Sequence, residues 1–188
     1  MRVDWKPGTM IYPLPAVMVS CGNDESEYNI ITVAWTGTIC TNPPMCYISI
    51  RPERHSYSII KRNMEFVINL TTAEMAFPTD WCGVRSGKEY HKFEEMKLTP
   101  GKCTVVNAPL IEESPLCIEC RVKEIVSLGS HDMFIADVVN VRADESHLNP
   151  ETGKLELAEA NPLVYVHGGY YELGSKIGKF GWSVEKKK

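Results

Sequence analysis

The chain has 188 residues, a hydrophobic content of 44% and a charged content of 23%, which are ordinary values for a globular protein. This length predicts a single domain over residues 1–188 with a core that needs no disulfide staples. The net charge of −4 argues against non-specific nucleic-acid binding, which requires a cationic surface. The lysine run at 186–188 is the one run of like charge, and we interpret it as a solvated end.

Neither a membrane span nor a secretory signal is visible in the sequence. No stretch reaches the roughly 18 apolar residues that a bilayer span requires, and the N-terminus lacks a long apolar run. The chain has seven cysteines, an odd number, whereas a disulfide framework normally uses an even set. We therefore expect reduced thiols and a cytoplasmic protein.

Short, β-branched apolar runs dominate the chain and predict strands. In chain order they cover residues 16–20, 30–35, 45–50, 66–70, 117–126, 133–141 and 163–166. Helical patterns are few and short, at 56–62, 71–76 (with Thr71 or Thr72 as cap) and 90–96. Because helical patterns do not separate successive strands, the expected fold is mainly β, a barrel with short helical inserts.

The segment from Leu116 to Val126 alternates between apolar and polar residues. Ile118, Cys120 and Val122 fall on one face and Glu119, Arg121 and Lys123 on the other, as in a half-buried antiparallel strand. The turn residues at 127–130 then predict a hairpin with the strand at 133–141.

Residues 51–56 join a strand end to a helix start and offer partners for a phosphate. Arg51 could fork onto phosphate oxygens, and Ser56 could donate its hydroxyl beside the N–H groups of the helix start. An ordinary charged loop, with Ser56 as a helix cap, explains the same residues.

Two neighbouring features also allow either a ligand-binding or a purely structural interpretation. The segment Trp35-Thr36-Gly37-Thr38 reads as a turn whose N–H groups could bond the edge of a flat ligand, or as a plain loop packed by Trp35. Asn69 lies in an apolar strand, so its amide either faces a ligand or bonds a neighbouring backbone.

Other common motifs are absent or weak. Neither a Walker loop nor a Rossmann motif is present. Cys117 and Cys120 form a CxxC pattern, but positions i and i+3 of a strand point to opposite faces, so we expect structural thiols and no metal site. Cys82 is the one cysteine placed as a candidate for ligand contact.

An ordered set of motifs resembles the flavin reductase-like, FMN-binding split-barrel family, in particular its flavoredoxin-like branch. The resemblance runs from about Pro13 to Lys179. The matching elements are Trp35-Thr36-Gly37, Pro43-Pro44 with Ser49-Ile50-Arg51, Arg54-His55-Ser56-Tyr57, Phe66 to Leu70, Cys82-Gly83 with Ser86-Gly87 and Lys92-Phe93, Gly129 with His131 and Phe134, and Gly168 to Gly181.

The resemblance implies a six-stranded Greek-key split barrel that binds FMN, usually as a homodimer whose interface closes the site. By resemblance, the flavin lies against Trp35, Thr36, Gly37 and Thr38, and its phosphate is held around Ser49, Arg51, His55 and Ser56. Ile50 and Tyr57, from the same motifs, are also expected among the cofactor-binding residues. Asn69, Cys82 and Gly83 lie close by. Ala136 stands where many relatives have glycine.

The implied chemistry is hydride transfer from NADH or NADPH to the flavin, followed by electron transfer to an acceptor or redox partner protein. Because the cofactor carries this chemistry, we expect no catalytic dyad, and His131 is the candidate nicotinamide contact. Two alternatives stay open: a flavoredoxin-like electron-transfer protein without NAD(P)H turnover, and a split-barrel binding module without enzymatic activity.

Overall fold

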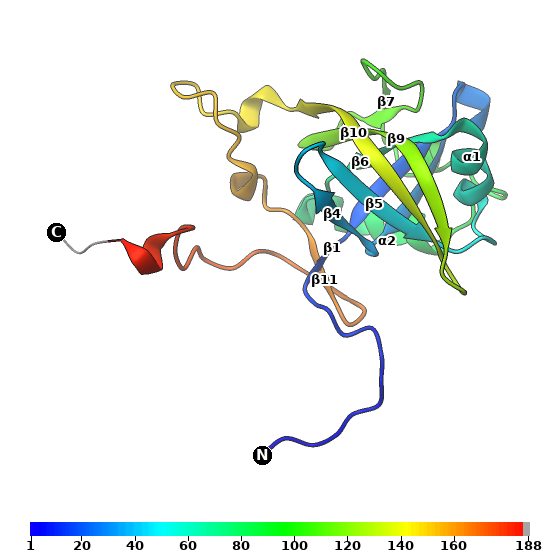
Figure 1. Cartoon of the computed structure of the whole chain (residues 1–188). Coiled ribbons are helices and arrows are strands. Elements are labelled where there is room, and N and C mark those ends of the chain that lie inside the picture. Colours follow the sequence, from blue (N-terminus) through cyan, green and yellow to red (C-terminus); the bar gives the residue numbers. More distant parts are fainter. Residues whose placement is uncertain (186–188) are drawn as a thin grey trace.

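A seven-stranded antiparallel sheet with the order β3-β2-β6-β9-β10-β5-β4 forms the body of the protein. It is described by a computed structural model that covers residues 1–185, so the lysine run at 186–188 lies outside the described residues. The sheet curls into the half-closed body seen in Figure 1. Its strands are β2 (Val17–Cys21), β3 (Asn29–Val33), β4 (Thr36–Cys40), β5 (Met45–Ile50), β6 (Glu65–Asn69), β9 (Leu116–Ser127) and β10 (Asp132–Ala143).

Two small sheets and short helices complete the described fold. One small sheet has the order β1-β11-β12 and the other pairs β7 with β8. Their strands are β1 (Leu14–Pro15), β7 (Pro100–Gly101), β8 (Leu110–Ile111), β11 (Val164–Val166) and β12 (Gly169–Tyr171). The α-helices are α1 (His55–Asn63), α2 (Ala76–Val84) and α3 (Lys92–Glu95), and the 3₁₀ turns are Glu25–Glu27, Ala73–Met75, Glu145–His147, Leu157–Ala160 and Trp182–Val184.

The main core fills the inside of the curled sheet. Phe66, Phe134 and Ile48 are fully buried there, and α1 adds Ile60 from its inner face. A second cluster, which includes Met18 and Cys82, packs α2 and α3 against the outer side of β2 and β3. Burial of aliphatic and aromatic side chains supplies most of the driving force for this arrangement.

The predicted mainly β architecture is confirmed, and most predicted strands agree with observed ones to within one or two residues. The strand at 45–50 matches β5, and the helix at 56–62 is α1. The predicted hairpin is the β9–β10 pair, whose turn has Gly129 at φ 100°. Cys117 and Cys120 belong to different core clusters, which confirms that they point to opposite faces.

Several local predictions were wrong. Residues 36–38 begin a strand rather than a turn, because β4 pairs with β5 in an antiparallel ladder. The helix expected at 71–76 is a 3₁₀ turn followed by α2, which runs through residues 80–83. Pro78 does not stop α2 because it lies in the first turn, where its missing N–H has no carbonyl to serve.

Glu119 departs from the expected polar face of its strand because it is fully buried. Its carboxylate accepts hydrogen bonds from the backbone N–H groups of Thr104, Val105 and Val106 and from Asn140. These hydrogen bonds lower its pKa against the opposing effect of burial. Glu119 therefore anchors the loop before β8 and is not a solvated strand residue.

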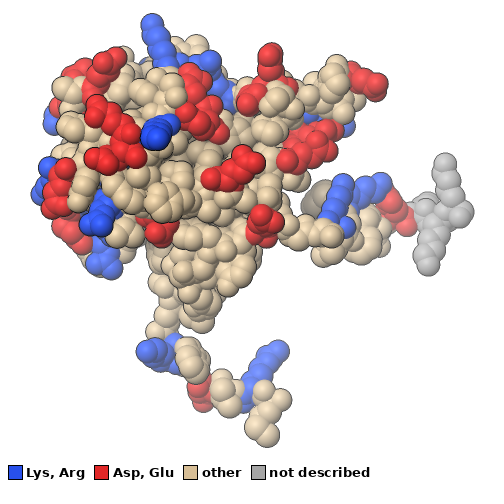
Figure 2. All heavy atoms as spheres, turned by 180° about the vertical axis from the view of Figure 1, so that it is seen from behind, with Lys and Arg blue, Asp and Glu red and all other residues tan. Residues whose placement is uncertain are grey.

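Both termini extend from the body as arms, residues 1–13 and 172–185 (Figure 1). In Figure 2 one arm extends below the body from a protrusion drawn almost entirely in tan and the other extends sideways, while the face of the body in view carries interspersed acidic and basic side chains. The arms are rich in exposed apolar side chains, among them Trp5, Ile11, Ile177, Phe180 and Trp182. Soluble proteins seldom leave so many large apolar groups without a covering surface.

Candidate functional site

Two adjoining cavities lie where the ends of β3 and β5 meet the start of α1, the C-terminal part of α2 and the β11–β12 hairpin. We call them the aromatic cavity, of about 360 Å³, and the cationic cavity, of about 330 Å³. Ile31, Arg54 and Gly83 line both, so the two cavities share a wall.

The aromatic cavity is lined by Ala16, Ile31, Thr32, Val33, Ala34, Trp35, Ser49, Ile50, Arg51, Arg54, Asp80, Gly83, Val84, His131, Tyr165 and Tyr170. The cationic cavity is lined by Asn29, Ile31, Glu53, Arg54, His55, Ser56, Cys82, Gly83, Arg85, Ser86, Gly87 and Lys92.

Trp35 and His131 supply flat surfaces to the aromatic cavity. The backbone carbonyl of Trp35 accepts a hydrogen bond of 2.9 Å from the N–H of Ser49, which fixes the segment between β3 and β4 against β5. The ring planes of Trp35 and His131 differ by only 7°, with centroids 6.4 Å apart. Burial first, and then the positive charge of Arg51, lowers the pKa of His131, so its imidazole is neutral near pH 7.

The opposite part of the aromatic cavity is formed by α2 and the β11–β12 hairpin. Tyr165 and Tyr170 face each other across the two strands, with ring centroids 5.8 Å apart. The phenol of Tyr170 donates a hydrogen bond of 3.1 Å to the carboxylate of Asp80 on α2. Burial and the charge of Asp80 raise the pKa of Tyr170 to about 12, so this phenol keeps its proton.

Lys92 is the most unusual residue of the cationic cavity, because only 3% of it is exposed. Its ammonium donates hydrogen bonds of 2.7 Å to the carbonyl oxygens of Ile30 and Cys82. Within residues 1–185 no carboxylate lies within 4 Å of this ammonium. Burial lowers its pKa to about 8, and an ammonium held in such a place is stabilised by an anion.

The start of α1 adds further polar groups to the cationic cavity. Ser56 is buried and accepts a hydrogen bond of 2.7 Å at its hydroxyl from the amide of Asn29. The helix cap is Arg54, not Ser56, and it has no side-chain capping bond, so the first N–H groups of α1 receive no side-chain oxygen. Burial, and then Lys88 and Lys92, lowers the pKa of His55.

The structure gathers most of the sequence-predicted site residues around these cavities. Trp35, Ser49, Ile50, Arg51 and His131 line the aromatic cavity. His55, Ser56 and Cys82 line the cationic cavity, and Gly83 lines both.

Five predicted residues lie outside both cavities. Gly37 and Thr38 are paired to Tyr47 and Cys46 in the β4–β5 ladder, and the hydroxyl of Thr36 donates to the carbonyl of Tyr47 at 2.6 Å. The sequence predicted these three residues as a loop beside the flavin. In the structure they belong to strand β4, because they pair with β5.

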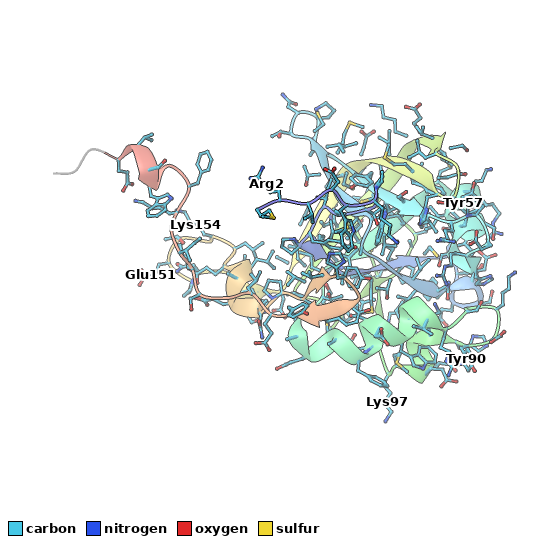
Figure 3. The ribbon with its side chains drawn as sticks, turned by 90° about the horizontal axis from the view of Figure 1, so that it is seen from below. Arg2, Tyr57, Tyr90, Lys97, Glu151 and Lys154 are labelled. Atoms are coloured by element: carbon cyan, nitrogen blue, oxygen red, sulfur yellow. The ribbon has the colours of Figure 1, made fainter. Side chains whose placement is uncertain are left out.

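Tyr57 and Asn69 have structural contacts instead of cavity contacts. The phenol of Tyr57 donates to the carboxylate of Asp132 at 2.6 Å, and the residue lies within the body of the protein (Figure 3). The Asn69 amide donates to the carbonyl of Met18 and the hydroxyl of Ser20, and its oxygen accepts from the N–H of Ile111. Of the two interpretations of Asn69, the structure supports the backbone partner.

Ala136 was noted for its effect on nicotinamide approach, but it is fully buried in the main core opposite Cys46. It therefore does not line either cavity.

Sequence reasoning missed several cavity residues as ligand candidates. Lys92 was read only as part of a motif in a weakly helical, charged segment, and nothing local indicates that its side chain is buried. Asp80, Tyr165 and Tyr170 reach the aromatic cavity only through the packing of α2 and the hairpin on the sheet. Arg85 lies at the C-cap of α2, over the ring of Tyr90.

The described residues show neither a metal site nor a helix able to span a membrane. Residues 1–185 contain no group of three His, Cys, Asp or Glu side chains placed to hold a metal ion. The helices within the same range are all too short or too polar to cross a membrane.

Comparison with known proteins identifies the family. A model of the flavin reductase like domain matches residues 9–174. The chain belongs to this family. The structure of flavoredoxin from Desulfovibrio vulgaris (Miyazaki F) superimposes with a TM-score of 0.90 at 28% identity, over 98% of this chain and all of that one. The predicted split-barrel fold is thereby confirmed. Its main sheet has seven strands and not the six that the resemblance implied.

Sequence relatives agree with this family assignment. A protein of Archaeoglobus fulgidus with no assigned function is 29% identical over 131 residues, which is 70% of this chain and 73% of that protein. The FMN reductase (NADH) RutF of Serratia proteamaculans is 22% identical over 111 residues, which is 58% of this chain and 61% of that protein. The family thus includes flavoproteins of both the flavoredoxin and flavin reductase kinds.

Proposed function

We propose that this protein, acting as a single domain, binds FMN across the two cavities and works as an NAD(P)H:flavin oxidoreductase. The isoalloxazine ring would occupy the aromatic cavity and the phosphate the cationic cavity. The observation that carries the proposal is the buried ammonium of Lys92, which has only neutral carbonyl partners within a cavity that adjoins a flat-walled one. A dianionic group joined to a planar ring matches both cavities.

The cationic cavity fits a phosphate by its donor set. Lys92, Arg54 and Arg85 bring positive charge, and Ser56 and the first N–H groups of α1 bring neutral donors. Charge-assisted hydrogen bonds of this kind are about twice as strong as neutral ones. Among the described residues that line the cationic cavity, Glu53 is the single carboxylate. It is exposed, and its carboxylate lies 3.6 Å from the guanidinium of Arg51.

The aromatic cavity fits the ring system. Bound FMN would supply hydride and one-electron chemistry, while the residues of the chain bind and orient the reactants. Neutral His131 can donate or accept a hydrogen bond at the cavity wall, so we propose it as the nicotinamide contact.

The absorbance spectrum of the purified protein, recorded before and after addition of FMN, tests this proposal. Flavin bands that persist after gel filtration support it. A colourless protein whose spectrum and fluorescence do not respond to FMN would favour a binding module for another ligand.

A flavoredoxin-like electron-transfer protein is the second candidate. The match to flavoredoxin over 98% of the chain favours it, because that protein is more similar along its whole length than the FMN reductase RutF. Anaerobic mixing of the FMN-loaded protein with NADH or NADPH separates the two candidates. Bleaching within seconds supports the reductase, whereas a flavin reduced only by dithionite or a redox partner protein supports electron transfer.

We also propose that the protein is a cytoplasmic homodimer. The exposed apolar residues of the two arms support a second copy as the covering surface. Light scattering after gel filtration tests this, and removal of residues 175–188 should shift the mass towards that of one chain.

A further inference from the structure

The β11–β12 hairpin brings two tyrosines to the aromatic cavity by its turn geometry. His167 and Gly168 form the turn, with φ values of 47° and 84°, and Val166 pairs with Gly169 on either side. Such a two-residue turn with positive φ at both positions fits the twist of a tight hairpin. The register then places Tyr165 directly opposite Tyr170, and both rings line the cavity.

The hairpin is held differently along its two strands. β11 pairs with β1, where Tyr165 lies opposite Leu14, and the ring of Tyr12 packs on His167 with centroids 4.4 Å apart. β12 is an edge strand of the described sheet, so its outer side has no strand partner there. The bond from Tyr170 to Asp80 fastens β12 to α2 across the cavity.

Charge distinguishes this part of the cavity from the rest. Of the described residues that line the aromatic cavity, Asp80 is the single carboxylate, whereas Arg51 and Arg54 are cationic. The phenol rings and this carboxylate both favour a planar ring with positive charge, through cation–π attraction and Coulomb attraction. Oxidised nicotinamide is a ring of this kind.

We propose that Tyr165 and Tyr170 form the wall that receives the nicotinamide ring, and that Asp80 is a positioning residue that holds Tyr170 over the cavity. This inference rests on the proposed function, because it places the second reactant beside the proposed flavin site. Because the phenol of Tyr170 is engaged by Asp80, its ring is the part of the side chain left for contact with the ligand.

The test is a titration of FMN-loaded protein with NAD⁺, in which the change in the flavin absorbance bands reports binding without turnover. Tyr170→Phe keeps the ring and loses the bond to Asp80, and Asp80→Asn loses the charge. We expect each to raise the Kd for NAD⁺ roughly threefold to tenfold, which is the effect of one modest hydrogen bond or charge. Tyr170→Leu, which loses the ring as well, should raise it further.

Two controls separate a role in binding from a role in folding. Tyr171→Phe alters the neighbouring tyrosine, which is exposed and outside the cavity lining, and should leave the Kd for NAD⁺ unchanged. The Kd for FMN, measured by flavin fluorescence, should rise by a smaller factor than the Kd for NAD⁺ in every Tyr170 and Asp80 variant, because the phosphate in the cationic cavity supplies FMN with an anchor that these substitutions leave in place.

Each remaining outcome has a definite meaning. Wild-type protein that takes no FMN overturns the proposed function and this inference with it. Protein that binds FMN but does not respond to NAD⁺, or variants that bind NAD⁺ as the wild type does, overturn the inference alone. Equal losses of FMN and NAD⁺ affinity would show that Tyr170 serves the flavin site or the fold instead.

Discussion

The two cavities differ in how deeply their key groups are held. The cationic cavity is built from buried groups that are fixed to the body of the protein, such as Lys92 on the carbonyls of Ile30 and Cys82 and Ser56 on Asn29. The aromatic cavity is closed by partly exposed groups of a three-residue strand, held to α2 by one hydrogen bond. We therefore expect the cationic cavity to determine the affinity for the cofactor and the more exposed aromatic cavity to select the second reactant.

The largest effect on FMN affinity is expected for Lys92→Met, which removes the buried ammonium. Its charge-assisted bond to a phosphate contributes about 1.5–3 kcal/mol, so the Kd for FMN should rise roughly tenfold to a hundredfold. Riboflavin, which lacks the phosphate, should bind as before. Fluorescence titrations with both flavins measure the difference.

Lys97→Met is the matched control for Lys92→Met. Lys97 lies just beyond α3 and its side chain points into solvent at the edge of the molecule (Figure 3). The two flavins should bind the control as they bind the wild type. If Lys92→Met weakened FMN and riboflavin equally, the phosphate would have been placed in the wrong cavity.

Raising the pH should weaken FMN binding in the same way as Lys92→Met, because it removes the proton and the charge of the Lys92 ammonium. The pKa of Lys92 is about 8 in the free protein, and a bound phosphate favours the ammonium and so raises that pKa. Between pH 7, where the phosphate is already a dianion, and pH 8 the FMN affinity should therefore be nearly level, and it should fall as pH rises above 8, by at most about tenfold per unit. In Lys92→Arg, whose guanidinium stays charged, the profile between pH 7 and 9.5 should be flat.

A smaller effect is expected at the two arginines near the shared wall. Arg54 lines both cavities and Arg51 only the aromatic one. Arg54→Ala should weaken FMN relative to riboflavin by about threefold to fivefold, because a contact of an exposed charge contributes at most about 1 kcal/mol. The sequence alone favoured Arg51 for this role, and a greater FMN-specific loss in Arg51→Ala would restore that assignment.

The smallest effect on binding is expected for Asn69→Ala, which sharpens the contrast between site and core. The substitution leaves the buried N–H of Ile111 without its acceptor, so the free energy of unfolding should fall by about 1–3 kcal/mol. The Kd for FMN of the folded protein should stay within about twofold. Chemical denaturation and flavin titration measure the two quantities, and a tenfold loss of affinity would return Asn69 to the ligand site.

Sequence patterns predicted what depends on local periodicity. β9 and β10 were found because alternation and a glycine turn are local signals, and α1 because it follows a strand and a Pro break. β4 was missed because Gly37 and Thr38 look like turn residues, and only pairing with β5 makes them a strand.

The site was predicted in part for the same reason. Trp35, Ser49, Arg51, His55 and Ser56 lie in contiguous motifs, and the structure places them around the two cavities. Lys92 was not singled out, because the burial of a lysine depends on the packing of α3 against β3 and not on the residues beside it. The tyrosines of the hairpin come from a part of the chain more than 100 residues from those motifs.

The central claim is that a buried cationic cavity holds the phosphate of a flavin whose ring lies in the adjoining cavity. Equilibrium titration of the wild-type protein with FMN and with riboflavin, followed by flavin fluorescence, tests it most directly. The account predicts that FMN binds at least about tenfold more tightly than riboflavin, as a charge-assisted phosphate contact requires. Equal affinities, or no binding of either flavin, would contradict it.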